Sequence, residues 1–332
     1  MPLSVHKMIY RTDDNRIFLC EKNESGLGLL RVYAPCGEVE IPESLGGEKV
    51  TEIGKYCFGP KGHLREHEKE LREAKLWNFE DTSFSGRAGI SAVRPVFAEN
   101  LESLVLPDSV LEIKDYAFYR CSRFTAIECG PALTKIAGDA FMNCRNLRHI
   151  TFRADPSEPT GMREFCKLLN QEIEISFAKN GITLAKILMP EYTESYELIG
   201  PAHIFHLEVE GEGFRARKQF DNGKFMFREY DSVFEKASCS ENFLTLLLMA
   251  VFRLNYPFEL TENAEETYSK YIGDNEVRVM KKLGRTRDIS TMENLIKSGL
   301  ISKKGITAAV TESAAMGFTK ETALIIRAAS ER

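Results

Sequence analysis

The chain superposes on itself at an offset of 23 residues between positions 101 and 152. Along this stretch, adding 23 to the number of an apolar residue leads to another apolar residue, and polar residues fill the positions between. The matched sets are Leu101/Phe124/Leu147, Leu104/Ile127/Ile150, Val110/Leu133, Ile113/Ile136, Ala117/Ala140, Phe118/Phe141 and Cys121/Cys144. A fixed period of this kind is typical of a solenoid, in which each unit supplies a short strand and a turn and buries one face against the next unit.

Further copies flank this stretch. Ile53 and Phe58 lie 60 residues before Ile113 and Phe118, which indicates an earlier unit separated from the others by an insertion. A degraded unit is predicted from residues 75–79 with Ile90, Val93 and Phe97, and a last, capping strand is predicted at 173–175, because Ile173 lies 23 residues after Ile150. We therefore predict a solenoid of about five or six rungs over residues 37–177, preceded by an N-terminal β cap over residues 1–36.

The repeat resembles a known class. The segments 103–113 and 116–124 carry an apolar residue before Pro107, then Val110, Ile113, the pair Ala117 and Phe118, Cys121 and Phe124. This pattern resembles the BspA-like bacterial class of leucine-rich repeats over roughly residues 37–175. The resemblance implies a leucine-rich-repeat fold, a general binding role and a place for the repeat cysteine in the solenoid core. Members of this class are often secreted or attached to the cell surface, where they resemble adhesins.

The cysteines fit this picture. None of the eight forms a Cys-x-x-Cys pair or has the spacing of zinc ligands, so we expect buried thiols in a reducing compartment. Cys121 and Cys144 would occupy adjacent rungs about 4.8 Å apart, a separation that a disulfide permits. We favour two buried thiols over that bridge.

Residues 61–75 are charged nearly throughout and predict a solvated helix inserted in the solenoid. Within it, His63 and His67 match the H-x-x-E-H pattern, in which two histidines share a helix face and bind zinc. Charges on every face of this helix, and the lack of an obvious third ligand, favour a chance pair. We therefore predict no metal and no cofactor.

After residue 177 the repeat stops, and residues 178–332 are predicted to form a small β element followed by helices. Strands are predicted at 182–189, 203–209 and 214–220, with His203 and His206 on opposite faces, which argues against a shared metal. A buried helix over 242–252 is predicted to be capped by Ser240.

Shorter helices are predicted at about 275–283, 290–298, 303–316 and 320–330, with a capping box at Ser290 and caps at Ser302 and Thr319. These helices weakly resemble ankyrin-type repeats, and generic α-hairpins fit equally well. One basic cluster lies at a helix end: Lys281, Lys282, Arg285 and Arg287. The helix dipole alone accounts for such a cluster, and a phosphate or nucleic-acid site is the less favoured interpretation.

Together these patterns assign the chain to the α/β class: an interrupted leucine-rich-repeat solenoid followed by a mixed, mainly α-helical domain. The net charge of −5 argues against nucleic acid as a main partner. We expect a non-catalytic scaffold that binds another protein through the solenoid and docks a second partner through the helical module. Six residues between the buried strand positions would line the binding face: Ser103, Val105, Ala126, Glu128, His149 and Thr151.

Two other functions stay open. One is a cell-surface adhesin, and the other is a hydrolase with a site between the two halves, for which Glu208, Glu210 and Glu212 are acid/base candidates. The N-terminus lacks the pattern of a signal peptide, and the longest apolar run, 244–252, is far shorter than the roughly 20 residues that span a bilayer. We therefore expect no membrane insertion and a cytoplasmic protein, or a surface or secreted one if an export signal precedes this sequence.

Overall fold

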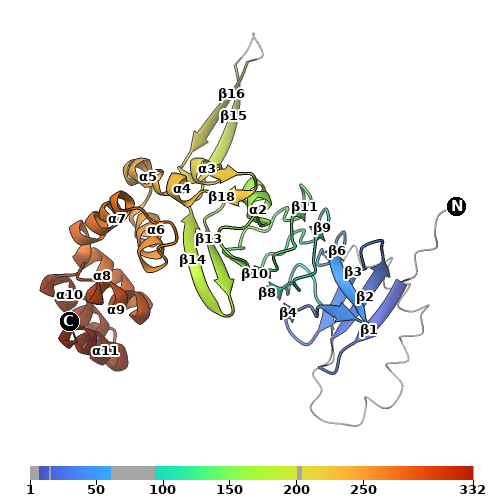
Figure 1. The fold of residues 1–332 in the computed structure, drawn as a ribbon, viewed down its shortest axis with the longest axis horizontal. Coiled ribbons are helices and arrows are strands. Elements are labelled where there is room, and N and C mark those ends of the chain that lie inside the picture. Colours follow the sequence, from blue (N-terminus) through green and yellow to red (C-terminus); the bar gives the residue numbers. More distant parts are fainter. Residues whose placement is uncertain (1–6, 15, 61–93, 200–203, 332) are drawn as a thin grey trace. The chain divides into compact units, whose positions relative to one another are not determined.

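The computed structural model describes residues 7–14, 16–60, 94–199 and 204–331 (Figure 1). It divides into two compact units, Met1–Lys179 with Asn222–Lys224, and Asn180–Asp221 with Phe225–Arg332. Three predictions from the sequence lie outside the described residues: the inserted helix at 61–75, the His63/His67 pair within it, and the part of the degraded repeat at 75–93.

The first unit begins with an antiparallel element. It is formed by β1 (Lys7–Arg11), β2 (Ile17–Lys22) and β3 (Leu27–Ala34). Almost every residue of β3 is buried, because β3 also pairs with β6 (Glu48–Ile53) and β7 (Arg94–Pro95). Since β6 is the first parallel strand of its sheet, the antiparallel element covers the end of the repeats that would otherwise expose an unpaired edge.

Two parallel ladders then form the solenoid (Figure 1). The first ladder has the spatial order β13-β12-β10-β8-β4. Its strands are β4 (Glu38–Glu40), β8 (Ser103–Val105), β10 (Ala126–Cys129), β12 (His149–Phe152) and β13 (Ile173–Lys179). The second ladder runs from β6 through β9 (Glu112–Ile113) to β11 (Lys135–Ile136), and β5 (Ser44–Leu45) pairs with β6. The predicted solenoid is thus confirmed.

The pairing register follows the sequence period. Ile127 lies opposite Leu104 on one side and Ile150 on the other, both 23 residues away. Across the insertion, Ile53 pairs with Ile113, as the offset of 60 predicts. At the last rung the prediction is wrong by two residues, because Ile150 pairs with Ile175 rather than with Ile173. In this unit helix α2 (Met162–Leu168) lies between the two strands, and the connection is two residues longer.

The core of the solenoid consists of stacked identical positions. Phe118 stacks on Phe141 with ring centroids 4.9 Å apart, and the tilted ring of Phe165 follows at 5.1 Å from Phe141. Cys121 and Cys144 are buried free thiols, and the Cys144 Sγ–H donates to the carbonyl of Phe118 over 2.7 Å. The thiols of the core therefore act as small buried groups with a local acceptor, as expected.

The second unit contains a β element and the helices. Its strands are β14 (Ile182–Met189), β15 (Thr193–Ile199) and β16 (Ile204–Glu210), followed by helix α3 (Gly213–Ala216) and the short strands β17 (Phe220–Asp221) and β18 (Lys224–Phe225). β15 and β16 form an antiparallel hairpin. The predicted strand at 214–220 is wrong: this segment turns into α3, where the Arg217 side chain donates to the carbonyls of Pro190 and Gly213.

Eight further helices follow among the described residues: α4 (Phe227–Asp231), α5 (Phe234–Ser240), α6 (Phe243–Asn255), α7 (Glu262–Asp274), α8 (Glu276–Thr286), α9 (Ile289–Lys297), α10 (Lys303–Ala315) and α11 (Thr319–Ser330). α6 is largely buried and packs on β14, whereas α8 packs on α10 and α9 packs on α11. The helical C-terminal region is confirmed, although the sequence did not predict α7.

The helix caps correct the prediction in detail. Asn242, not Ser240, caps α6, because its extended backbone brings Oδ1 within reach of the amides of Leu244 and Thr245. Ser240 instead ends α5. Asp288, not Ser290, caps α9 by accepting from the amide of Thr291, and α11 has no side-chain cap at its start. Ser302 caps α10 as predicted.

One polar cluster is buried among these helices. Asp231 accepts two hydrogen bonds from Arg253, at 2.7 and 2.9 Å, and a third from the Tyr268 hydroxyl at 2.9 Å. Arg253 is fully buried and also donates to the carbonyls of Tyr256 and Phe258. Because each charge is paired and hydrogen-bonded, the cluster fixes the arrangement of α4, α6 and α7 without leaving an isolated buried charge.

Candidate functional site

The structure places the six predicted binding residues on one face of the first ladder. Ser103, Ala126 and His149 lie opposite one another in one row across β8, β10 and β12. Val105, Glu128 and Thr151 form the second row, two residues further along the strands. Since side chains two apart on a strand point to the same side, both rows lie on the outer face, away from the buried row of Leu104, Ile127 and Ile150.

Four residues that the sequence did not predict extend these rows. Glu38 and Glu40 of β4 continue them beyond β8, and Glu174 and Ser176 of β13 continue them beyond β12. We call these ten positions the strand face. Each of its side chains is exposed or half-buried. Five strands about 4.8 Å apart give the strand face a width of about 19 Å.

The strand face has a small, neutral centre and acidic edges. Its centre holds Ser103, Val105, Ala126 and Thr151, whose short side chains leave the surface nearly flat. Glu38 and Glu40 lie at one edge, and Glu174 lies toward the other, 3.4 Å from the Nδ1 atom of His149. A flat centre between like charges is suited to contact with another macromolecule rather than to enclosure of a small molecule.

Arg153 closes the strand face at the end where β12 leaves the ladder. Its guanidinium contacts the Glu128 carboxylate at 2.7 Å and the Asp108 carboxylate at 2.8 Å, and it donates to the carbonyl of Leu106. Burial alone would lower the pKa of Arg153, but the hydrogen bonds to the two carboxylates outweigh burial and raise it. Arg153 therefore stays charged and ties three successive rungs together.

A tyrosine cluster lies on the turns of the solenoid. The rings of Tyr56 and Tyr116 stack with centroids 5.1 Å apart, and Tyr119 contacts both edge-on. Tyr56 and Tyr116 have φ angles of 55° and 58°, a left-handed conformation that costs a bulky residue free energy. Sequence reasoning missed this cluster, although the offset of 60 residues between the two tyrosines was the signal that could have found it.

The alternative sites do not assemble among the described residues. Glu208 and Glu210 are exposed on β16, whereas Glu212 lies beyond the strand and pairs with Arg215 at 2.8 Å. Within the described ranges, no three metal-ligating side chains come together. Within the same ranges, no helix has the length and apolar character needed to cross a membrane.

The fold and the strand face together define a parallel-strand solenoid with one open, solvated ladder. Residues 96–185 match the family model of the BspA type leucine rich repeat region, with six copies. These residues are therefore BspA-type leucine-rich repeats, as the sequence pattern predicted.

Among solved structures, the chain is similar to a leucine rich cell surface protein from Faecalibacterium prausnitzii A2-165, with 17% identity and a TM-score of 0.26. The match covers 53% of this chain and 44% of that protein, so this chain spans less than half of its length. No curated protein matches this chain.

Proposed function

We propose that this chain is a non-catalytic protein-binding module and that the strand face is its binding surface. The observation that carries this proposal is the register of the first ladder, which aligns ten solvated side chains in two rows over five strands. Leucine-rich repeats are a scaffold for binding, and an open ladder offers a rigid surface whose outward side chains can vary without disturbing the core.

The chemistry of the strand face defines the kind of partner. Carboxylates at both edges favour a partner that places basic side chains about 15 to 20 Å apart. The small residues between them, including Ala126 and Val105, allow close approach of a flat surface or an extended chain. Glu128 is already held by Arg153, so its charge contributes less than the charges of Glu38 and Glu40.

The test replaces a small central residue by a large charged one. Ala126→Arg is expected to abolish capture of any specific partner from the soluble proteins of the native host, because the new side chain projects from the middle of the strand face. Met142→Arg is the matched control, since Met142 is 46% exposed on a turn and lies off the strand face. Equal capture by both variants, each shown to be folded by circular dichroism, would overturn the proposal.

We also propose that the partner is met inside the cell. The eight cysteines are free, and six of them are buried, which is typical of proteins from reducing compartments. Fractionation of host cells, with detection of the chain by antibody, tests this point. Recovery with the soluble cytoplasmic proteins would support it, whereas recovery from the cell surface would favour the adhesin-like alternative.

A further inference from the structure

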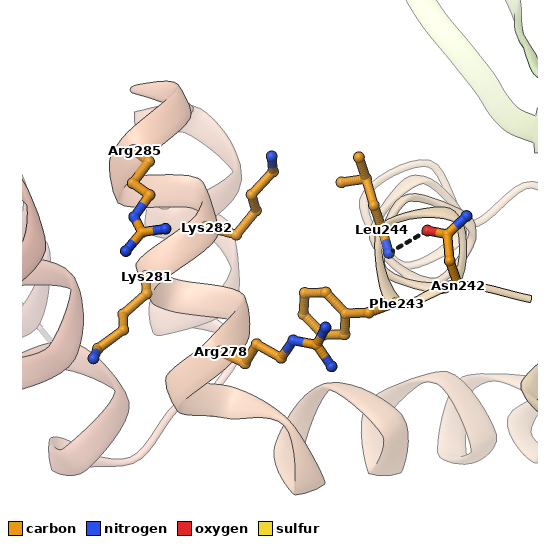
Figure 2. Close-up of a pocket in the computed structure, with 7 residues that line it drawn as sticks. All are labelled: Asn242, Phe243, Leu244, Arg278, Lys281, Lys282 and Arg285. Atoms are coloured by element: carbon orange, nitrogen blue, oxygen red, sulfur yellow. Dashed lines mark hydrogen bonds between the residues drawn. The ribbon is translucent and has the colours of Figure 1, made fainter.

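Helix α8 presents a row of positive charge. Arg278, Lys281, Lys282 and Arg285 have the spacing i, i+3, i+4 and i+7, which places them on one side of the helix. Val279, Met280 and Leu283 occupy the other side and are buried. The four cations line a cavity of about 390 Å³ together with the first residues of α6: Asn242, Phe243 and Leu244 (Figure 2).

This basic row differs from the cluster expected from the sequence. Arg287 does not take part: it adopts a left-handed conformation at the end of α8, and its guanidinium pairs with Glu321. Arg278 takes its place, with the guanidinium 3.8 Å from the ring centroid of Phe243. We refer to Arg278, Lys281, Lys282 and Arg285 with Phe243 and Leu244 as the basic groove.

The helix dipole does not explain the basic groove. Positive side chains are favoured in the last turn of a helix, where Arg285 lies, but Arg278 lies in the first turn, where the dipole disfavours them. Like charges three and four residues apart on a helix also repel. Among the described residues, Arg285 is held by Glu312 at 2.6 Å, whereas no carboxylate pairs with Lys281 or Lys282.

The layout of the charges indicates what would neutralise them. In Figure 2, Lys282 extends toward Leu244 and Arg278 lies beside Phe243, whereas Lys281 and Arg285 extend along the outer side of α8. The cations are thus spread over two helical turns, about 10 Å, rather than directed at one point. A single phosphate needs donors that converge, and the amides of Leu244 and Thr245 already bond to Asn242.

An apolar surface borders the charges. Leu244 is 37% exposed, and the ring of Phe243 is half-buried beneath Arg278. This combination fits a ligand that carries several carboxylates at helical spacing and one apolar side chain. We propose that the basic groove binds an acidic, amphipathic helical segment of a second protein. This site lies within the second unit and does not depend on the proposed role of the strand face.

The test is fluorescence polarisation at 0.15 M salt with a labelled 14-residue helical peptide. Its glutamates are spaced i, i+3, i+4 and i+7, and a leucine flanks them. The peptide should bind saturably, and the double variant Arg278→Glu/Lys282→Glu should weaken binding by about tenfold or more. The double variant Lys236→Glu/Lys320→Glu, with the same change in net charge on α5 and α11, should weaken it by less than about twofold.

Two further arms keep the proposal falsifiable. Leu244→Ala should weaken binding several-fold if the apolar contact is real, and an unchanged affinity would overturn the amphipathic part of the proposal. Inorganic tripolyphosphate should compete only weakly. Absence of saturable peptide binding, equal losses in the two double variants, or tighter binding of tripolyphosphate than of the peptide would each overturn the proposal, provided that circular dichroism shows every variant to be folded.

Discussion

The ring of Phe58 stacks on the ring of Phe118, with centroids 5.4 Å and planes 5° apart, although the two residues lie 60 positions apart in the sequence. Phe118 in turn stacks on Phe141 at 4.9 Å. The repeat before the insertion and the repeats after it therefore share one continuous aromatic core. This contact explains how a solenoid interrupted in sequence remains one structural unit.

Phe118 is predicted to be the most sensitive position of this core. Phe118→Ala should lower the free energy of unfolding of the first unit by about 3–5 kcal/mol, because it removes a fully buried ring from between its stacked neighbours. Urea denaturation followed by near-ultraviolet circular dichroism measures the change. Met142→Ala, at a residue 46% exposed, should change it by about 0.5 kcal/mol or less. Similar losses in the two variants would contradict the stacked core.

Removing Asp231 is predicted to destabilise the second unit strongly. Asp231→Ala leaves the fully buried Arg253 without its carboxylate, which should cost about 3–5 kcal/mol in thermal or urea unfolding. The double variant Asp231→Leu/Arg253→Met should recover part of this loss, since neither charge then remains buried. Glu331→Ala, which breaks an exposed pair with Arg327, is the control and should have no measurable effect. A double variant less stable than Asp231→Ala would argue against this explanation.

The thiols are predicted to fall into two reactivity classes. Burial raises the pKa of Cys20 to about 12 and also raises the pKa values of Cys57 and Cys129, so their reactive thiolates are scarce at pH 8. Cys36 and Cys239 are exposed. A chromogenic disulfide reagent at pH 8 should therefore modify two of the eight thiols rapidly, and all eight after denaturation. Rapid modification of more than two in the native protein would contradict the buried cysteine positions.

Glu276 is predicted to make the stability of the helical region depend on pH. Its carboxylate accepts hydrogen bonds from the Ser302 amide and hydroxyl, both at 2.7 Å, and these bonds lower its pKa from the ordinary value of 4.5. A lowered folded-state pKa contributes stability above the unfolded value, and this contribution is lost as the pH falls through the folded value. The urea midpoint of the native protein should therefore exceed that of Glu276→Gln at pH 7, and the difference should shrink below pH 4.5. A difference that grows on acidification would contradict the contact.

The repeat made the fold of the solenoid predictable from the sequence. Apolar matches at fixed offsets place Ile53 beside Ile113 and Ile127 beside Leu104, because only one register buries both members of each pair. The shift that pairs Ile150 with Ile175 could not be predicted, since it depends on where α2 packs. Likewise, the choice of Asn242 over Ser240 as a cap depends on where α5 ends.

The candidate sites were predictable only in part, for the same reason. Ser103, Ala126 and His149 share one offset, so the centre of the strand face follows from the repeat. Glu38 does not share it, because the insertion separates β4 from β8. For the basic groove, the role of Arg278 depends on its contact with Phe243, which only the packing of α8 against α6 creates.

The central claim is that the strand face binds a protein. Its most direct test is to place a photo-crosslinking amino acid at Thr151, in the second row of the strand face, and to irradiate the protein in native host extract. We predict one or a few discrete protein adducts from Thr151, and none of the same mass when the crosslinker is placed at the exposed turn residue Met142. Identical adduct patterns from the two positions, or no adduct from Thr151, would contradict the claim.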